Sequence, residues 1–81
     1  MQIIKIHPLD NVVVALTDIE KETVLNVDGD KITVAEDIKR GHKICISFIK
    51  AGEPVVKYGN EIAKATKDIK AGEWVHTHNA Q

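Results

Sequence analysis

The residues best suited to chemistry stand near the end of the chain, in the segment His76-Thr77-His78-Asn79. Imidazole gains or loses a proton near neutral pH and is a common ligand of divalent metals. In an extended segment, residues two apart point to the same side, so His76 and His78 would stand side by side with Thr77 turned away. The pair could bind one metal ion together, or one histidine could bind it while the other transfers a proton. For His-x-His alone, a strand end exposed to solvent is the ordinary alternative.

Lysine, tyrosine and further polar positions add to this set. Lys57 and Tyr58 are neighbours, so in regular β structure they face opposite ways and only one of them would point into a site. We favour Lys57, whose ammonium group could neutralise a substrate carboxylate, over Tyr58, whose ring could cover the edge of the core. His42 and Lys43 follow a turn glycine and could contact a substrate, or could be an exposed turn pair. Asn79 could orient a histidine or hold a substrate hydroxyl.

The remaining reactive residue types favour structural roles. His7 is expected to pack or to cap a turn, and Asp10, although it is a candidate carboxylate, follows Pro8 in ordinary turn chemistry. Cys45 is the one cysteine and alternates with apolar residues, which favours a buried thiol in a reducing compartment. Trp74 is expected to anchor the core or a subunit interface.

Length and charge limit the partners of the chain. Its 81 residues suffice for one domain with a modest core, and so small a domain can hardly enclose a substrate alone, since ligand pockets bury most of the ligand. A net charge of −1 and one residue each of Phe, Tyr and Trp argue against binding to nucleic acid. The longest apolar run, Val12–Leu16, is too short to cross a membrane, and the N-terminus lacks the pattern of a signal peptide. We therefore expect a cytoplasmic protein that supplies one wall of a site.

One short sequence phrase occurs four times along the chain, and its copies should determine the strands and turns that carry these residues. Its copies are Asp18–Val24, Asp37–Ile44, Phe48–Val55 and Asp68–Val75. Each contains an isoleucine, two mostly polar residues and then a glycine, which the first and loosest copy replaces with Glu22. Glycine suits a turn residue at positive φ. We predict that each copy is a strand end, a tight turn and the start of the next strand, and the irregular spacing argues against a solenoid.

The segments between these turns are typical of short β-strands. Val12, Val14 and Leu16 would share one face of a strand, and Asp28-Gly29 is a strong hairpin signal. Asn60–Thr66 could form either a strand or a short helix. The sequence thus predicts a mostly β fold of short strands and glycine turns, with at most short helical turns. The predicted strands are Asn11–Leu16, Thr23–Val27, Lys31–Ala35, Ile44–Phe48 and Val55–Tyr58.

Taken in order, four stretches of the chain resemble the SAF-domain segment of the altronate dehydratase and galactarate dehydratase family. These stretches are Ile6–Val12, Gly41–Lys43, Gly52–Gly59 and Ala71–Asn79. The likeness runs over nearly the whole chain, and the Lys-Tyr-Gly and His-Thr-His-Asn phrases are its most distinctive parts. The resemblance implies that residues 1–81 form a single SAF domain with the β-clip fold, in agreement with the hairpins and glycine turns.

The resemblance also implies a function. Enzymes of this family remove water from sugar acids such as altronate or galactarate, giving 2-keto-3-deoxy acids, and depend on Fe²⁺ or Mn²⁺. The chain would then be a small subunit or N-terminal segment, inactive alone, that contributes part of the active site to a larger catalytic subunit or domain. In that context we assign His76, His78 and Lys57 to catalysis, with His76 and His78 also as metal ligands. The substrate-binding residues would be Asn79, Tyr58, His42 and Lys43.

The sequence also admits three other functions. One is a non-catalytic SAF module that binds a sugar acid or a partner protein, as in the antifreeze-like branch of these domains. Another is the small subunit of a sulfolactate sulfo-lyase, a related two-subunit enzyme. The third, a free-standing metal carrier, depends on His76 and His78 alone.

Overall fold

The computed structural model describes residues 1–81 and contains eight short strands and no helix. Along the chain these are β1 (Ile3–Ile4), β2 (Val12–Ala15), β3 (Val24–Val27), β4 (Asp30–Thr33), β5 (Lys43–Cys45), β6 (Pro54–Lys57), β7 (Asn60–Lys64) and β8 (Trp74–Val75). The predicted mostly β fold is confirmed, and the ambiguous segment Asn60–Thr66 supplies a strand. No segment forms a helix that is long and apolar enough to cross a membrane.

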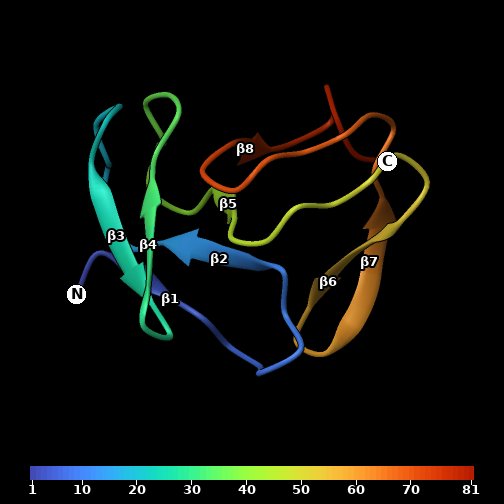
Figure 1. Ribbon diagram of the computed structural model, residues 1–81, viewed down its shortest axis with the longest axis horizontal. Coiled ribbons are helices and arrows are strands. Elements are labelled where there is room, and N and C mark those ends of the chain that lie inside the picture. Colours follow the sequence, from blue (N-terminus) through green and yellow to red (C-terminus); the bar gives the residue numbers. More distant parts are fainter.

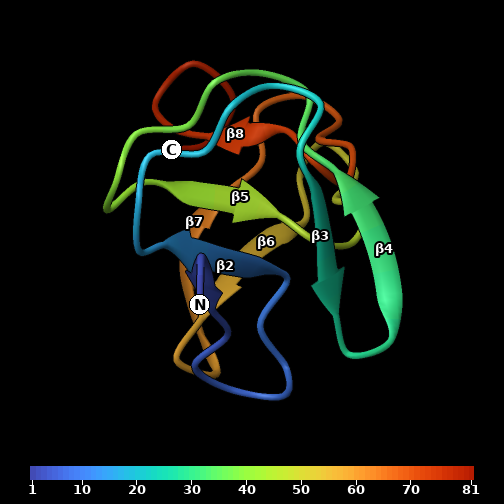
Figure 2. The ribbon, with the colours of Figure 1, turned by 90° about the vertical axis from the view of Figure 1, so that its left-hand side faces the viewer.

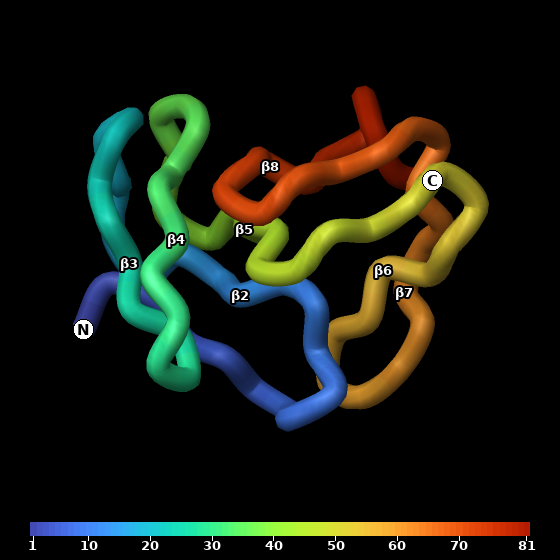
Figure 3. Tube along the Cα trace, in the orientation of Figure 1, coloured from blue at the N-terminus to red at the C-terminus, as the bar shows by residue number.

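A four-stranded antiparallel sheet forms the middle of the domain. Its strand order is β1-β2-β5-β8, and its register pairs Val13 with Ile44 and Ile44 with Trp74. Two hairpins, β3–β4 and β6–β7, stand on opposite sides of this sheet (Figure 1). The N-terminus lies near the first hairpin and the C-terminal tail near the second, as the tube in Figure 3 shows.

Each face of the central sheet covers a separate hydrophobic core. Successive residues of a strand point to opposite faces, so Val13 enters the core beside β3–β4 and Val12 the core beside β6–β7. The predicted face of Val12, Val14 and Leu16 is only partly buried, since Leu16 is 39% exposed. The opposite face is buried as well, because a hairpin covers the sheet on each side.

The four copies of the repeated phrase form four turns with the same backbone conformation. In each copy the N–H of the turn residue donates to a distant carbonyl, and the next N–H donates to the carbonyl three residues back. The predicted turn is confirmed, including at the position where glutamate replaces glycine. The turn residues and their φ angles are Glu22 (72°), Gly41 (87°), Gly52 (89°) and Gly72 (96°).

These turns associate in two pairs. Asp18, Asp37 and Asp68 each accept an N–H group from the partner turn, whereas Phe48 stands where a fourth aspartate would. A hairpin separates the two partners within each pair but not the second copy from the third, and this explains the irregular spacing of the copies. The buried isoleucines of the partners form antiparallel bridges, Ile19 with Ile38 and Ile49 with Ile69.

The strand predicted at Ile44–Phe48 differs from the observed one at both ends. Strand β5 spans Lys43–Cys45, after which the chain leads into the third turn. Ile44 is buried and Ile46 half-buried, as expected, but Phe48 is 56% exposed. The apolar alternation continues past the end of the strand because Phe48 occupies the exposed aspartate position of the turn.

The two hairpins share one turn type. The φ angles are 51° and 88° in Asp28-Gly29, and 57° and 74° in Tyr58-Gly59. Positive φ at both central residues matches the twist of two-residue hairpins, so the hairpin predicted at Asp28-Gly29 is confirmed. The second turn ends at Gly59, because Asn60 already pairs with Lys57.

Replacing Glu22 with glycine should stabilise the domain. A left-handed backbone costs a non-glycine residue about 1–2 kcal/mol, and the extra freedom of glycine in the unfolded chain offsets about 0.5–1 kcal/mol of that gain. We expect the free energy of unfolding in urea to rise by about 0.5 kcal/mol. Lys21→Gly is the control, because Lys21 is exposed in the same turn without a positive φ, and it should destabilise. A loss of stability in both variants would contradict the prediction.

Candidate functional site

Three histidines and one tryptophan gather at one end of the central sheet. His42 precedes β5, and Trp74 opens β8, which pairs with β5. The antiparallel register of these strands continues to His42 and His76, whose ring centroids lie 5.6 Å apart. The Trp74 ring is stacked on His76 at 4.9 Å and lies against His78 at 5.0 Å. We call His42, Trp74, His76 and His78 the histidine cluster.

The extended geometry predicted for His76 and His78 is wrong. Strand β8 ends before His76, and residues 76–79 form a turn, in which the Asn79 N–H donates to the His76 carbonyl at 3.1 Å. Strand periodicity therefore does not place the two imidazoles side by side. Both contact the Trp74 ring instead, so the tryptophan brings them into one site.

Asn79 holds this turn in place. Its side chain is 2% exposed, accepts the His76 N–H at 3.0 Å and donates to the Trp74 carbonyl at 2.8 Å. The chain beyond it pairs with the end of β7 through a bridge between Ala65 and Ala80. Of the two roles predicted for Asn79, the structure supports the orientation of a histidine. Its amide is buried with both ends bonded, so it does not face a substrate.

His42 is oriented by the tryptophan. The Trp74 Nε1–H donates to His42 Nδ1 over 3.0 Å. The His42 backbone is fixed on both sides, because its N–H donates to Lys39 and its carbonyl accepts the Ala15 N–H. The His42 side chain is half-buried, whereas those of His76 and His78 are exposed. The cluster thus holds one constrained imidazole and two that face solvent.

Trp74 belongs to the candidate site, although the sequence analysis did not place it there. It was predicted as a core or interface anchor, and it does pack against the core beside β3–β4. It also contacts the rings of His42, His76 and His78. The spacing of Trp74 and His76, two residues apart in an extended segment, is the signal that could have placed both on one face.

Lys43 lies next to the cluster. It lines a shallow depression of about 270 Å³ together with His76 and Thr77. A lysine and an imidazole at the edge of one depression offer positive charge and hydrogen-bond donors to a carboxylate. The other walls are apolar and come from Val55, Ile62, Ala63, Val75 and Ala80.

Lys57 and Tyr58 are not part of the histidine cluster. They lie at the turn of the β6–β7 hairpin. The open end of this hairpin adjoins the C-terminal tail, and its turn points to the opposite end of the domain (Figures 1 and 2). The Lys57 ammonium lies 5.0 Å from the centre of the Tyr58 ring in a cation–π contact, and Tyr58 is 57% exposed. The predicted site residues are thus divided between two ends of the molecule.

A buried carboxylate joins this hairpin turn to the N-terminal loop. Asp10 is 5% exposed and accepts the His7 N–H at 3.0 Å and the Gly59 N–H at 2.8 Å. Burial raises the pKa of this carboxyl, but hydrogen bonds from Gly59, Tyr58 and His7, with the electrostatic attraction of His7, outweigh it and hold the pKa below its usual value. His7 Nδ1 in turn accepts the Leu9 N–H at 3.1 Å. The turn-capping roles expected of His7 and Asp10 are confirmed.

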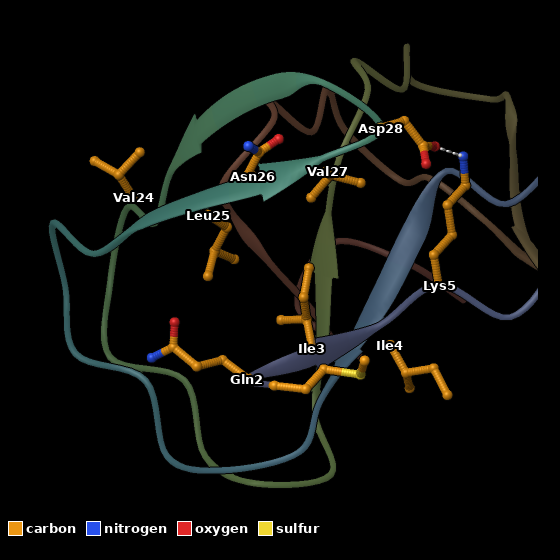
Figure 4. A pocket seen from close by; sticks show the side chains of 10 residues that line it. Gln2, Ile3, Ile4, Lys5, Val24, Leu25, Asn26, Val27 and Asp28 are labelled. Carbon is orange, nitrogen blue, oxygen red and sulfur yellow. Dashed lines mark hydrogen bonds and ion pairs between the residues drawn. The ribbon is translucent and has the colours of Figure 1, made fainter.

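Another depression lies between β1 and β3, away from the predicted chemistry (Figure 4). It measures about 430 Å³ and is lined by residues 1–5 and 24–28. The side chains of Ile3, Leu25 and Val27 point toward one another beneath it, and the ion pair of Lys5 with Asp28, at 2.6 Å, closes one end. Its charged side chains, Lys5 and Asp28, are paired with each other, and none of the predicted site residues lines it.

The donor groups of this chain do not complete a metal site. Nowhere do three or more His, Cys, Asp or Glu side chains gather in a group that could hold a metal ion, whereas catalytic metals are typically held by three protein ligands. Cys45 is no candidate, because burial raises the pKa of its thiol to about 11 and its Sγ donates to the Ser47 carbonyl at 3.0 Å. A metal ion on His76 and His78 would need ligands from outside the chain, so the structure gives no support to a free-standing metal carrier.

The chain is similar to known proteins over its whole length. Residues 1–81 match the family model described as the altronate/galactarate dehydratase SAF domain. The chain is 48% identical over 81 residues to an altronate dehydratase of Escherichia coli (strain K12) and 50% identical over 78 residues to one of Bacillus subtilis (strain 168). These matches cover 100% and 96% of the chain but 16% of each relative, so the chain spans about one sixth of their length.

A shorter relative comes from a different enzyme. The chain is 41% identical over 51 residues to subunit alpha of the (2R)-sulfolactate sulfo-lyase of Paracoccus pantotrophus, which covers 63% of the chain and 76% of that subunit. The family model nevertheless spans the complete fold, from β1 to the histidine cluster. The chain therefore belongs to the altronate/galactarate dehydratase SAF domain family.

Proposed function

We propose that the chain is the SAF part of a metal-dependent hydro-lyase that converts altronate-type aldonates or aldarates to 2-keto-3-deoxy acids. The histidine cluster carries this proposal, because it presents exposed imidazoles at one end of a domain too small to enclose a substrate. Membership in a family named for altronate and galactarate dehydratases supports the substrate class. Since the chain spans 16% of the altronate dehydratases it resembles, a larger catalytic subunit or domain would supply the rest of the site.

The side chains of the cluster suit the proton transfers of a dehydration. The reaction removes a weakly acidic proton beside a carboxylate and expels the hydroxyl group of the next carbon, which requires a base and an acid. His76 and His78 are exposed, and one of them would carry one of these protons, while the larger catalytic part would supply the other acid or base. Lys43, which shares a depression with His76, would bind the substrate carboxylate. Lys57, at the other end of the domain, has no part in this proposal.

A divalent cation completes the proposed site. Bound Fe²⁺ or Mn²⁺ would neutralise the substrate carboxylate and so make the neighbouring proton easier to remove. Whichever of His76 and His78 does not transfer a proton could serve as a ligand, and the larger catalytic part would add the others. The single buried thiol, Cys45, fits a reducing compartment, and a cytoplasmic location is part of the proposal.

A hybrid enzyme tests this function. The chain replaces the stretch that it matches in the altronate dehydratase of Bacillus subtilis, to which it is 50% identical, and altronate dehydration is measured with Fe²⁺ or Mn²⁺. We expect the hybrid to be active. His76→Ala or His78→Ala, whichever removes the proton carrier, should lower its kcat about a hundredfold.

The control is a histidine outside the cluster. His7 lies in the Asp10 junction at the hairpin end, so His7→Ala should keep the activity of the hybrid at the cost of some stability. Full activity in both His76→Ala and His78→Ala would contradict a catalytic role. The chain would then act as a non-catalytic module that binds a sugar acid or the larger part.

A second candidate function is a subunit of a sulfolactate sulfo-lyase. It is favoured by the 41% identity to the alpha subunit of that enzyme, of which the chain covers 76%. The same cluster would then serve the elimination of sulfite rather than hydroxide. Pairing the chain with the large subunit of that enzyme and measuring sulfite release decides between the two, since only one of the substrates should turn over.

A further inference from the structure

Trp74 and His42 share the one hydrogen bond in this domain that joins two aromatic side chains, with Nε1 and Nδ1 3.0 Å apart. An indole N–H can donate a hydrogen bond but cannot accept one. The Nδ1 atom of His42 must therefore be the acceptor and carry no proton. A neutral imidazole has one proton, so that proton lies on Nε2.

We infer that Trp74 is a positioning residue that fixes His42 as the Nε2–H tautomer, so that His42 donates a hydrogen bond to an oxygen atom of the substrate and does not act as the base. The substrate in this statement rests on the proposed function. The matching ligand atom is a carboxylate or hydroxyl oxygen, because Nε2–H is the only polar group of the ring left free. A proton removed from carbon could bind only to Nδ1, and Trp74 already occupies that atom.

The surroundings of the pair favour a fixed geometry. The His42 N–H donates to Lys39 at 3.1 Å and its carbonyl accepts the Ala15 N–H at 2.9 Å. Trp74 is paired with Ile44 in the sheet, and its ring packs against the core beside β3–β4. Both backbones and the indole ring are held in place by the fold. The hydrogen bond from Trp74 therefore sets the orientation of the His42 imidazole.

The three histidines of the cluster differ in how their ring nitrogens are engaged. No hydrogen bond within the domain engages a ring nitrogen of His76 or His78, although both rings contact Trp74. Their ring nitrogens have no partner within the domain, whereas Nδ1 of His42 accepts the Trp74 N–H. The cluster therefore contains one imidazole whose tautomer is fixed and two whose ring nitrogens remain open to a ligand.

The tautomer can be read directly from the isolated chain. In a long-range ¹H–¹⁵N spectrum, His42 should show an unprotonated Nδ1 and a protonated Nε2, with His76 and His78 as internal references. Trp74 is the one tryptophan, so it can be replaced biosynthetically by benzothienylalanine, which keeps the ring shape and lacks the N–H. This replacement should turn His42 into a mixture of tautomers. A protonated Nδ1 in the unmodified chain, or an unchanged His42 pattern after the replacement, would overturn the inference.

Kinetics of the hybrid enzyme test the donor role. The amide nitrogen of glutamine overlies Nε2 of histidine, whereas that of asparagine overlies Nδ1. His42→Gln should therefore stay within about threefold of the parent kcat/KM, while His42→Asn and Trp74→Phe should lose about tenfold. Equal losses in the glutamine and asparagine variants would overturn the donor role. An inactive hybrid would defeat the proposed function alone, because the spectra need neither substrate nor partner.

Discussion

Gly72→Ala should leave the domain largely unfolded, or lower its free energy of unfolding by at least about 4 kcal/mol. A Cβ atom at this position would lie 2.1 Å from the Thr33 carbonyl oxygen, and φ is +96°. The backbone cannot move away easily, because the Gly72 N–H donates to Cys45 and its carbonyl accepts the Ala35 N–H. Small domains are stable by about 5–15 kcal/mol, so this clash removes much of the total.

Gly52→Ala is the matched control for this clash. Gly52 occupies the same position of the repeated turn at φ +89°, but an added Cβ would meet nothing within 4 Å. It should cost only the left-handed backbone penalty of about 1–2 kcal/mol. Urea unfolding followed by far-UV circular dichroism and Trp74 fluorescence gives both values. Equal losses would mean that the Thr33 carbonyl can move aside and that backbone conformation alone sets the cost.

Asp10→Asn should lower the free energy of unfolding by about 3 kcal/mol at neutral pH, since hydrogen bonds to charged groups contribute about 1.5–3 kcal/mol. The buried carboxylate accepts the N–H groups of His7 and Gly59. Asparagine has the same shape but replaces one acceptor with an NH₂ group, which would face a backbone donor. The hairpin turn should then separate from the N-terminal loop, which amide hydrogen exchange at Gly59 would show.

The cost of Asp10→Asn should depend on pH. The pKa of the carboxyl in the folded chain lies below its ordinary value of 3.8, so its contribution is complete above about pH 4 and is lost as the pH falls through the folded pKa. The difference between the two proteins should shrink over that range. Asp28→Asn, which removes an exposed carboxylate paired with Lys5, should change stability by less than about 1 kcal/mol. A pH-independent cost at Asp10 would contradict the charge-based explanation.

The turns and hairpins could be predicted because their causes are local. Glycine tolerates the positive φ that tight turns require, so Asp28-Gly29 and the repeated glycines mark turns, and the structure has positive φ at each. The pairing of the copies could not be read in the same way, since it depends on contacts between distant residues. The Ile19–Ile38 bridge, for example, joins residues that stand on either side of the β3–β4 hairpin in the sequence. The strand predicted over Ile44–Phe48 was too long at its C-terminal end for a related reason, since a turn can begin inside a segment of alternating apolar residues.

The structure brings several of the predicted site residues together, but not in the predicted geometry. His76, His78, His42 and Lys43 do lie at one end of the domain, but the expected strand geometry of the two tail histidines gave way to a turn. That turn depends on Asn79, whose buried amide bonds the His76 N–H and the Trp74 carbonyl. Nothing in a His-x-His pattern reports such a cap. The distance of Lys57 from the cluster likewise depends on the course of the β6–β7 hairpin. The types of the polar residues alone do not indicate that course.

Because the two hydrophobic cores share the central sheet, they should unfold together. Val12 and Val13 are neighbours in β2 yet enter different cores, and Ile44 and Cys45 of β5 do the same. Neither core can loosen without distorting the strands that form a wall of the other, so melting should be all-or-none. The imidazoles of the histidine cluster are attached next to β5 and β8, which belong to this shared sheet. A larger partner would therefore meet a preorganised surface and would lose little conformational entropy in ordering it.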